Sequence, residues 1–172
     1  MAFPKYARPE IERRWLVARE ALPDLARLPV RRIEDRYLSG GHLRLRIVID
    51  GDGARICKLG KKYDAVAKGE MPIVSIYLSD EEADALGTLP CRTARKNRYA
   101  LRDGSLDVYV DPPHPFAVFE IEFDDATAAA AFVPPPFAGR EITGDADFSG
   151  FALADAISPA GRTRADPPSP RA

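Results

Sequence analysis

Apolar and charged residues alternate with a period of two along much of the chain, which is the pattern of β-strands that have one charged face. In HLRLRIVID (42–50), four aliphatic residues share one face, and Arg44 and Arg46 occupy the other. In EIERRWLV (10–17), two glutamates and an arginine lie opposite the tryptophan, and in AVFEIEF (117–123) two glutamates oppose three apolar residues. These segments therefore predict strands with a charged side and an apolar side.

Strand-like segments of this kind recur from the N-terminal region to about residue 123. We expect strands over 10–17, 30–38, 42–50, 54–63, 71–78, 90–111 and 116–123. Turn signals separate them at Ser39-Gly40-Gly41, at Gly51-Asp52-Gly53 and at Asp103-Gly104, which divides the longest segment in two. Seven or eight strands joined by hairpin turns favour an antiparallel sheet or barrel.

Short helices are predicted around this sheet. The signals are a brief helix or turn before Pro29, a capping box that starts a helix at Ser79, an Ala-rich helix after Asp124 or Asp125, and a final helix over 148–157. We expect residues 1–158 to form a single domain and the Pro-rich residues 159–172 to be disordered.

The charges on the strand faces are segregated by strand. Cations dominate the middle strands, and carboxylates lie on the first and late strands, at Glu10, Glu12, Asp107, Glu120 and Glu122. A sheet with one solvated face is the ordinary explanation of such alternation, but these faces are unusually rich in arginine. If the sheet closes, the carboxylates would form a hard-oxygen site for Mg²⁺ or Mn²⁺, and the cations would suit a chain of phosphates.

Composition narrows the classes of partner. The net charge of −1 over 172 residues gives no basic field for nucleic acid or an anionic membrane. The longest apolar run, Ala126 to Val133, is too short to cross a bilayer, and the N-terminal residues lack the apolar core of a signal peptide.

Cys57 and Cys91 have no metal-like spacing, so we expect buried thiols and a cytoplasmic protein. The two histidines, His42 and His114, are expected in exposed loops.

EIERRWLV resembles the N-terminal Glu-x-Glu-x-Lys signature of the CYTH superfamily, the triphosphate tunnel metalloenzymes. The likeness continues in order through 35–46, 57–63, 76–86, 95–101, 106–109, 119–123 and 141–154. It implies an α+β fold in which an eight-stranded antiparallel β-barrel keeps its charged faces inside, with short helices packed around the outside.

The resemblance also implies roles for individual residues. The predicted metal ligands for Mg²⁺ or Mn²⁺ are Glu10, Glu12, Asp107, Glu120 and Glu122. The predicted phosphate-binding residues are Arg44, Arg46, Lys58, Lys96 and Arg98. Independently of the resemblance, the turn-prone Gly60 beside Lys61 and Lys62 indicates that one of these two is a surface lysine. Glu10, Glu12 and Arg14 are the predicted catalytic residues. Arg14 stands where the signature has Lys, and an arginine cannot act as a general base near neutral pH.

Three functions follow from the resemblance. Hydrolysis of inorganic triphosphate is the first choice, with a small-molecule triphosphate as partner and a homodimer as the assembly we allow for. An organic-triphosphate enzyme (thiamine triphosphatase, nucleoside triphosphatase or class IV adenylyl cyclase) is the second, although Trp15 faces away from the charged side. The third is a non-catalytic module that binds polyphosphate or a nucleotide.

Overall fold

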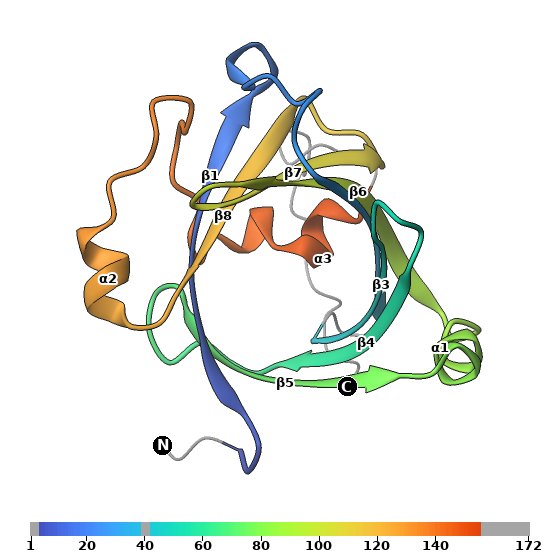
Figure 1. Ribbon diagram of the computed structural model, residues 1–172. Coiled ribbons are helices and arrows are strands. Elements are labelled where there is room, and N and C mark those ends of the chain that lie inside the picture. Colours follow the sequence, from blue (N-terminus) through green and yellow to red (C-terminus); the bar gives the residue numbers. More distant parts are fainter. Residues whose placement is uncertain (1–3, 39–41, 156–172) are drawn as a thin grey trace, which may run out of the picture.

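A computed structural model describes residues 4–38 and 42–155, and its strands close into an antiparallel barrel (Figure 1). Around the barrel the strand order is β1-β5-β4-β3-β2-β6-β7-β8. The strands are β1 (Arg8–Ala18), β2 (Val30–Leu38), β3 (Leu43–Ile49), β4 (Arg55–Lys62), β5 (Glu70–Leu78), β6 (Cys91–Leu101), β7 (Gly104–Asp111) and β8 (Phe116–Phe123). The predicted eight-stranded barrel is therefore confirmed.

The pairing registers place charged residues beside charged residues on the inner face of the barrel. Between β1 and β8, Glu12 pairs with Glu122 and Arg14 pairs with Glu120. Since side chains opposite one another in a ladder point to the same face, this seam brings carboxylates together inside the barrel.

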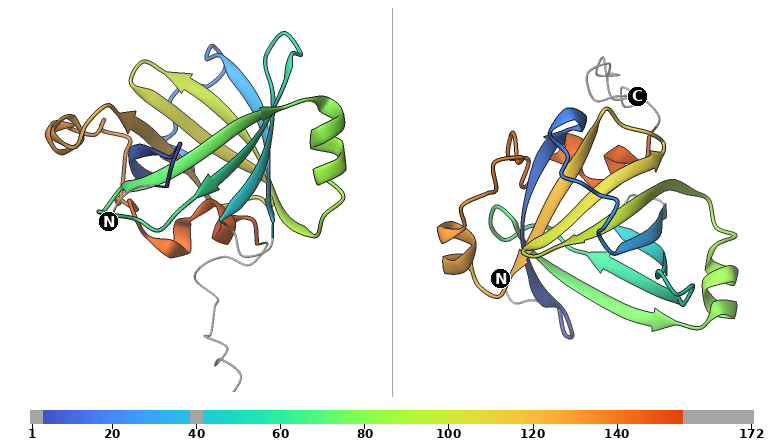
Figure 2. Two further views of the ribbon diagram at one scale, coloured as in Figure 1. Left: turned by 90° about the horizontal axis from the view of Figure 1, so that it is seen from below. Right: turned by 45° about the horizontal axis from the view of Figure 1, so that its top comes forward.

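Short helices and loops lie around the outside of the barrel (Figure 2), and apolar residues of the outward strand faces pack against them. Trp15 is only 2% exposed and stacks on Phe119, beside the segment that follows α2 (Ala126–Ala131). On the other side, Ala83 of α1 (Asp80–Leu86) packs on Leu45, and Ser79 forms the predicted capping box. Two of the three hydrophobic clusters among the described residues therefore lie on the outside of the barrel.

The C-terminal part of the described chain crosses one end of the barrel (Figures 1 and 2). It contains the 3₁₀ turn η2 (Ala146–Phe148) and the one-turn helix α3 (Gly150–Leu153). Phe148 and Leu153 pack on Tyr37, Tyr109 and other buried residues of the interior. The segment predicted as a helix over 148–157 is thus shorter, and residues 156 and 157 lie outside the described residues.

Some expectations need correction. His114 was expected to be exposed, but it is 4% exposed, because its ring stacks on Phe116 and its Nε2 lies 2.8 Å from the carbonyl oxygen of Leu153. Cys57 is buried as expected, whereas Cys91 is exposed. Before Pro29 only the 3₁₀ turn η1 (Arg19–Ala21) forms. The predicted turn at 39–41 and the predicted disordered tail at 159–172 lie outside the described residues.

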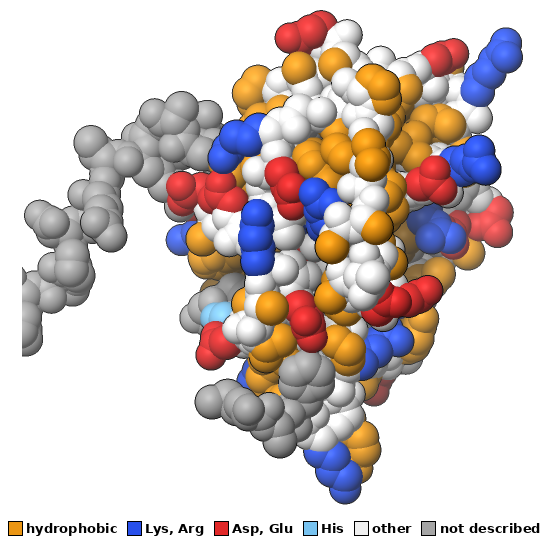
Figure 3. Space-filling model, turned by 90° about the vertical axis from the view of Figure 1, so that its left-hand side faces the viewer, with side chains coloured by type: hydrophobic (Ala, Val, Ile, Leu, Met, Phe, Trp, Pro, Cys, Tyr) orange, Lys and Arg blue, Asp and Glu red, His pale blue; other side chains and the backbone are white. Residues whose placement is uncertain are grey.

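The outer surface carries both signs of charge. Acidic and basic side chains are interspersed with apolar ones on the face shown in Figure 3. Within the described residues, no helix is long and apolar enough to span a membrane.

Candidate active site

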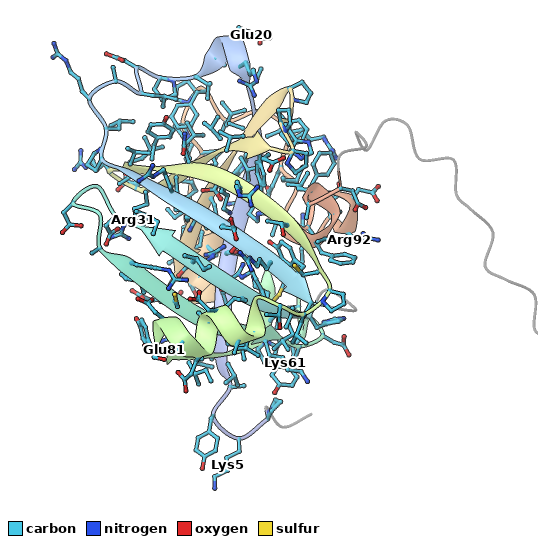
Figure 4. All side chains as sticks on the ribbon, turned by 90° about the vertical axis from the view of Figure 1, so that its right-hand side faces the viewer. Lys5, Glu20, Arg31, Lys61, Glu81 and Arg92 are labelled. Atoms are coloured by element: carbon cyan, nitrogen blue, oxygen red, sulfur yellow. The ribbon has the colours of Figure 1, made fainter. Side chains whose placement is uncertain are left out.

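A cavity of about 460 Å³ lies inside the barrel, a size typical of small-molecule sites. Residues from the C-terminal segment, including Ser149 and Gly150, line one end of it. Its acidic and basic lining residues are Glu10, Glu12, Arg14, Arg44, Arg46, Lys62, Asp64, Lys96, Glu120, Glu122 and Asp145. Figure 4 shows nitrogen and oxygen atoms of side chains between the strands.

Four carboxylates from the paired strands β1 and β8 line this cavity, and their surroundings differ. Burial raises the pKa of Glu12, and the nearby charge of Glu120 raises it further. Burial also acts on Glu120, but Arg98 and Arg14 outweigh it and hold the pKa of Glu120 well below its ordinary value. Burial and a neighbouring carboxylate therefore disfavour the ionised form of Glu12, whereas two arginines favour the ionised form of Glu120.

Lys62 is a cavity residue that the sequence reading left undecided. Its ammonium group forms an ion pair with Glu10 and lies 3.6 Å from Glu12 Oε1. Lys61, by contrast, is exposed (Figure 4) and lies over the ring of Tyr63. Strand parity distinguishes the two lysines, because Lys62 shares the inward face of β4 with Gly60.

Two buried aspartates each hold cations of the barrel interior. Asp35 accepts hydrogen bonds from Arg46 Nε at 2.6 Å and Arg46 Nη2 at 2.8 Å. Asp107 accepts from Arg98 through both oxygens, at 2.7 Å each, and from Lys96 Nζ at 2.5 Å. Asp107 was a predicted metal ligand, and the structure places it among cations. Asp35 was not singled out from the sequence.

The predicted phosphate-binding residues do not all face the same space. Arg44, Arg46 and Lys96 line the cavity, whereas Arg98 lines an adjoining recess of about 380 Å³ together with Glu120 and Glu122. Lys58 does not line the cavity. Its ammonium group lies 4.8 Å from the ring centroid of Tyr77, which is 74% exposed.

Arg14 is held by protein partners inside the barrel. Its Nη1 donates a hydrogen bond to the carbonyl oxygen of Phe148 at 3.0 Å, and its Nε lies 3.4 Å from Glu120 Oε2. Its backbone N–H also donates to Thr143 Oγ1 at 3.0 Å. Arg14 therefore links strand β1 to the C-terminal segment as well as to a site carboxylate.

The donor set fits a hard divalent cation in its chemistry. Glu10, Glu12, Glu120 and Glu122 supply the carboxylate oxygens that Mg²⁺ and Mn²⁺ prefer. The contacts of Lys62 with Glu10 and Glu12 show that this pair accommodates a positive charge. In their present positions, however, no three acidic, histidine or cysteine side chains among residues 4–38 and 42–155 are grouped closely enough to hold a metal ion.

No family model matches the chain, but individual proteins do. It is 41% identical over 71 residues to a protein of Nitrosomonas europaea named inorganic triphosphatase. This match covers 38% of the chain and 47% of that protein, so it spans about half the length of the curated relative.

Solved structures match over a longer stretch. The crystal structure of the hypothetical protein NE1496 has a TM-score of 0.54, and that of the inorganic triphosphatase NE1496 has a TM-score of 0.53. Each is 31% identical to the chain and covers 84% of it, which corresponds to 97% and 93% of the respective solved chains.

Proposed function

The chain belongs to the CYTH family of triphosphate tunnel proteins, and from this premise we propose that it is a divalent-metal-dependent triphosphatase that acts on inorganic triphosphate. The solved relative at 31% identity, described as an inorganic triphosphatase, covers most of the chain and supports the proposal.

The observation that carries the proposal is the distribution of charge in the cavity. Carboxylates enter from β1 and β8, while Arg44 and Arg46 enter from β3. In the strand order, β3 lies four strands from β8, which is the opposite wall of an eight-stranded barrel. A phosphate chain between these walls would meet guanidinium groups on one side and hard-oxygen donors on the other.

The metal site is assigned to four carboxylates: Glu10, Glu12, Glu120 and Glu122. When bound there, Mg²⁺ or Mn²⁺ would supply positive charge that offsets the negative charge of the phosphate oxygens. Asp107 also belongs to the predicted set, but Lys96 and Arg98 occupy its oxygens, so it would have to release them to become a ligand.

The remaining chemistry is assigned to this chain's own side chains. Arg44, Arg46 and Lys96 hold phosphate oxygens, and Lys62 offers a further ammonium group. Glu10 and Glu12 orient the attacking water, and one of these two carboxylates accepts its proton. The oxygen of that water forms a bond to the terminal phosphorus while the bridging P–O bond breaks, so that phosphate and pyrophosphate are released.

Arg14 has a different part in this scheme from the lysine of the family signature. A guanidinium does not give up a proton near neutral pH, so Arg14 serves as a fixed positive charge beside Glu120 and anchors Phe148.

A substrate panel tests the proposal. Phosphate release is measured with Mg²⁺ and with Mn²⁺ for inorganic triphosphate, ATP, thiamine triphosphate and pyrophosphate. The proposal expects inorganic triphosphate to give the highest kcat/KM. Preference for an organic triphosphate would refute the substrate assignment, and tight triphosphate binding without release from any compound would indicate a binding module.

A further inference from the structure

Asp35 occupies the centre of a group of cations in the barrel wall. It lies on the inward face of β2, is 1% exposed, and holds Arg46 through two hydrogen bonds. Arg44 Nε lies 3.7 Å from its Oδ1, and Lys96 Nζ lies 3.8 Å from its Oδ2. Burial alone would raise the pKa of Asp35, but Arg46 and Arg44 outweigh it and hold this pKa well below its ordinary value of 3.8.

Asp35 contacts these three cations without lining the cavity itself. Arg44, Arg46 and Lys96 all line the cavity, whereas Asp35 does not. Because Asp35 binds Nε and Nη2 of Arg46, the Nη1 amino group is left for a ligand. A carboxylate in this position orders the side chains that touch the substrate without touching it.

We propose that Asp35 is a positioning residue, which fixes the Arg46 guanidinium and, through shared contacts, Arg44 and Lys96 in the orientation that phosphoryl transfer requires. The inference rests on the proposed triphosphatase function and adds a residue to it. A carboxylate lowers the net positive charge of an anion site, so affinity alone would not favour an aspartate here. Asp35 instead favours the reaction by ordering these cations, because side chains that are already fixed lose less entropy when the transition state forms.

The Asp35→Asn variant separates positioning from affinity. Asparagine keeps the shape but loses the charge and turns an amide N–H toward the guanidinium donors. We expect kcat for triphosphate to fall by about 10- to 100-fold, while KM stays within about threefold of the wild-type value. An unchanged kcat, or a raised KM with unchanged kcat, would overturn the proposal.

Glu34→Gln is the matched control on the neighbouring residue of β2. Glu34 also holds two arginines, accepting from Arg36 Nε at 2.6 Å and from Arg95 Nε at 2.7 Å, but it faces the other side of the strand. A merely structural effect of losing a paired carboxylate would appear in both variants. We expect Glu34→Gln to lose stability while its kcat and KM stay at the wild-type values.

A second variant covers the case in which Asp35→Asn does not fold. Arg46→Lys keeps the charge in the cavity but cannot bind both oxygens of Asp35 in a fork. The proposal expects kcat to fall by at least about 10-fold, and KM to rise as well because Arg46 itself holds phosphate oxygens. A pure KM effect in Arg46→Lys would contradict it.

A readout that needs no activity distinguishes failure of this inference from failure of the proposed function. In ligand-free wild-type protein, NMR should show a slowly exchanging Nε–H of Arg46, identified by its absence in Arg46→Lys. The signal should persist in Glu34→Gln. Rapid exchange in the wild type would refute positioning by Asp35 even in an active enzyme. Slow exchange in a protein that hydrolyses no triphosphate would refute only the proposed function.

Discussion

Glu12 is buried and Glu120 is partly buried on the adjacent strand, and the pKa values of the two carboxyl groups shift in opposite directions. Burial raises the pKa of Glu12, and the carboxylates around it add to the effect. For Glu120 the guanidinium groups of Arg98 and Arg14 outweigh burial and lower it. The pKa of each carboxyl group here therefore depends more on its burial and on the surrounding charges than on its being a glutamate.

This difference predicts that Glu12→Gln lowers the activity and leaves the stability of the protein equal or higher. The change removes a charge that Glu120 and Glu10 repel, so the metal-free protein should unfold at an equal or higher temperature. The loss of a metal and water ligand should lower triphosphate hydrolysis by at least about 100-fold. Thermal unfolding and phosphate release are compared with those of Glu81→Gln, a control on the outer helix α1. A clear loss of stability with activity retained would contradict the assignment.

Arg14→Lys tests whether the arginine acts as an anchor. Lysine retains the charge beside Glu120 but cannot also hold the carbonyl of Phe148, so we expect the free energy of unfolding to fall by about 1–3 kcal/mol. Because the charge is kept, kcat should stay within about tenfold. Urea denaturation and steady-state kinetics measure the two effects.

The matched control for Arg14→Lys is Arg13→Lys on the outer face of β1. Arg13 donates to the carbonyl oxygens of Ala129 and Phe132, so its loss should also cost stability, with KM unchanged. A kcat loss of more than about 100-fold in Arg14→Lys at full stability would instead make Arg14 a direct phosphate ligand.

At the scale of elements, alternation along the strands predicted which residues face inward, but not how far along the barrel each one lies. Lys58 and Lys62 share a parity, yet only Lys62 reaches the carboxylates, because the barrel registers decide which strand positions meet. Asp35 was missed for a related reason. Its role depends on Arg46 of the neighbouring strand, a pairing that one strand's pattern does not contain.

The loop between β4 and β5 supports β1 at the site through Gly69. The Gly69 carbonyl accepts a hydrogen bond from the Glu12 N–H at 2.9 Å, and the φ of Gly69 is +76°. A Cβ there would lie 2.7 Å from the Glu12 carbonyl oxygen and 2.8 Å from Thr143 Cγ2. Alanine would therefore bring both backbone strain and a clash against the strand that carries Glu12.

We expect Gly69→Ala to lower the free energy of unfolding by about 2–4 kcal/mol and to reduce activity, because β1 must shift. Gly53→Ala is the matched control. Gly53 also has a positive φ, +88°, but a Cβ there meets nothing within 4 Å, so only strain of about 1–2 kcal/mol is expected, at full activity. Equal losses of stability in the two variants would show that the contact with β1 is unimportant.

For the whole molecule, the buried charges predict loss of stability in acid. Asp35, Asp107 and Glu120 have pKa values lowered by neighbouring cations despite burial. A group with a lowered folded-state pKa stabilises the protein above its unfolded pKa, and this contribution is lost as the pH falls. Glu12 has a raised pKa, so its protonation favours the folded state as the pH falls. The three groups with lowered pKa values outweigh this single contribution.

Urea denaturation should therefore show a falling free energy of unfolding from about pH 5 to about pH 3. Asp35→Asn, which lacks one of these titrations, should lose less stability over the same interval than the wild type. A wild-type stability that stays constant or rises toward pH 3 would show that these ion pairs do not stabilise the fold.

The central claim is that the barrel cavity uses carboxylate-held metal to cleave triphosphate. It is tested most directly by quantifying the products formed from inorganic triphosphate with Mg²⁺ or Mn²⁺, with excess chelator, and with Glu12→Gln. The account predicts equal amounts of phosphate and pyrophosphate from the wild-type protein with metal, no products above background with chelator, and at least about 100-fold less product with Glu12→Gln. Equal rates with and without chelator, or no cleavage of triphosphate by the metal-loaded wild type, would contradict it.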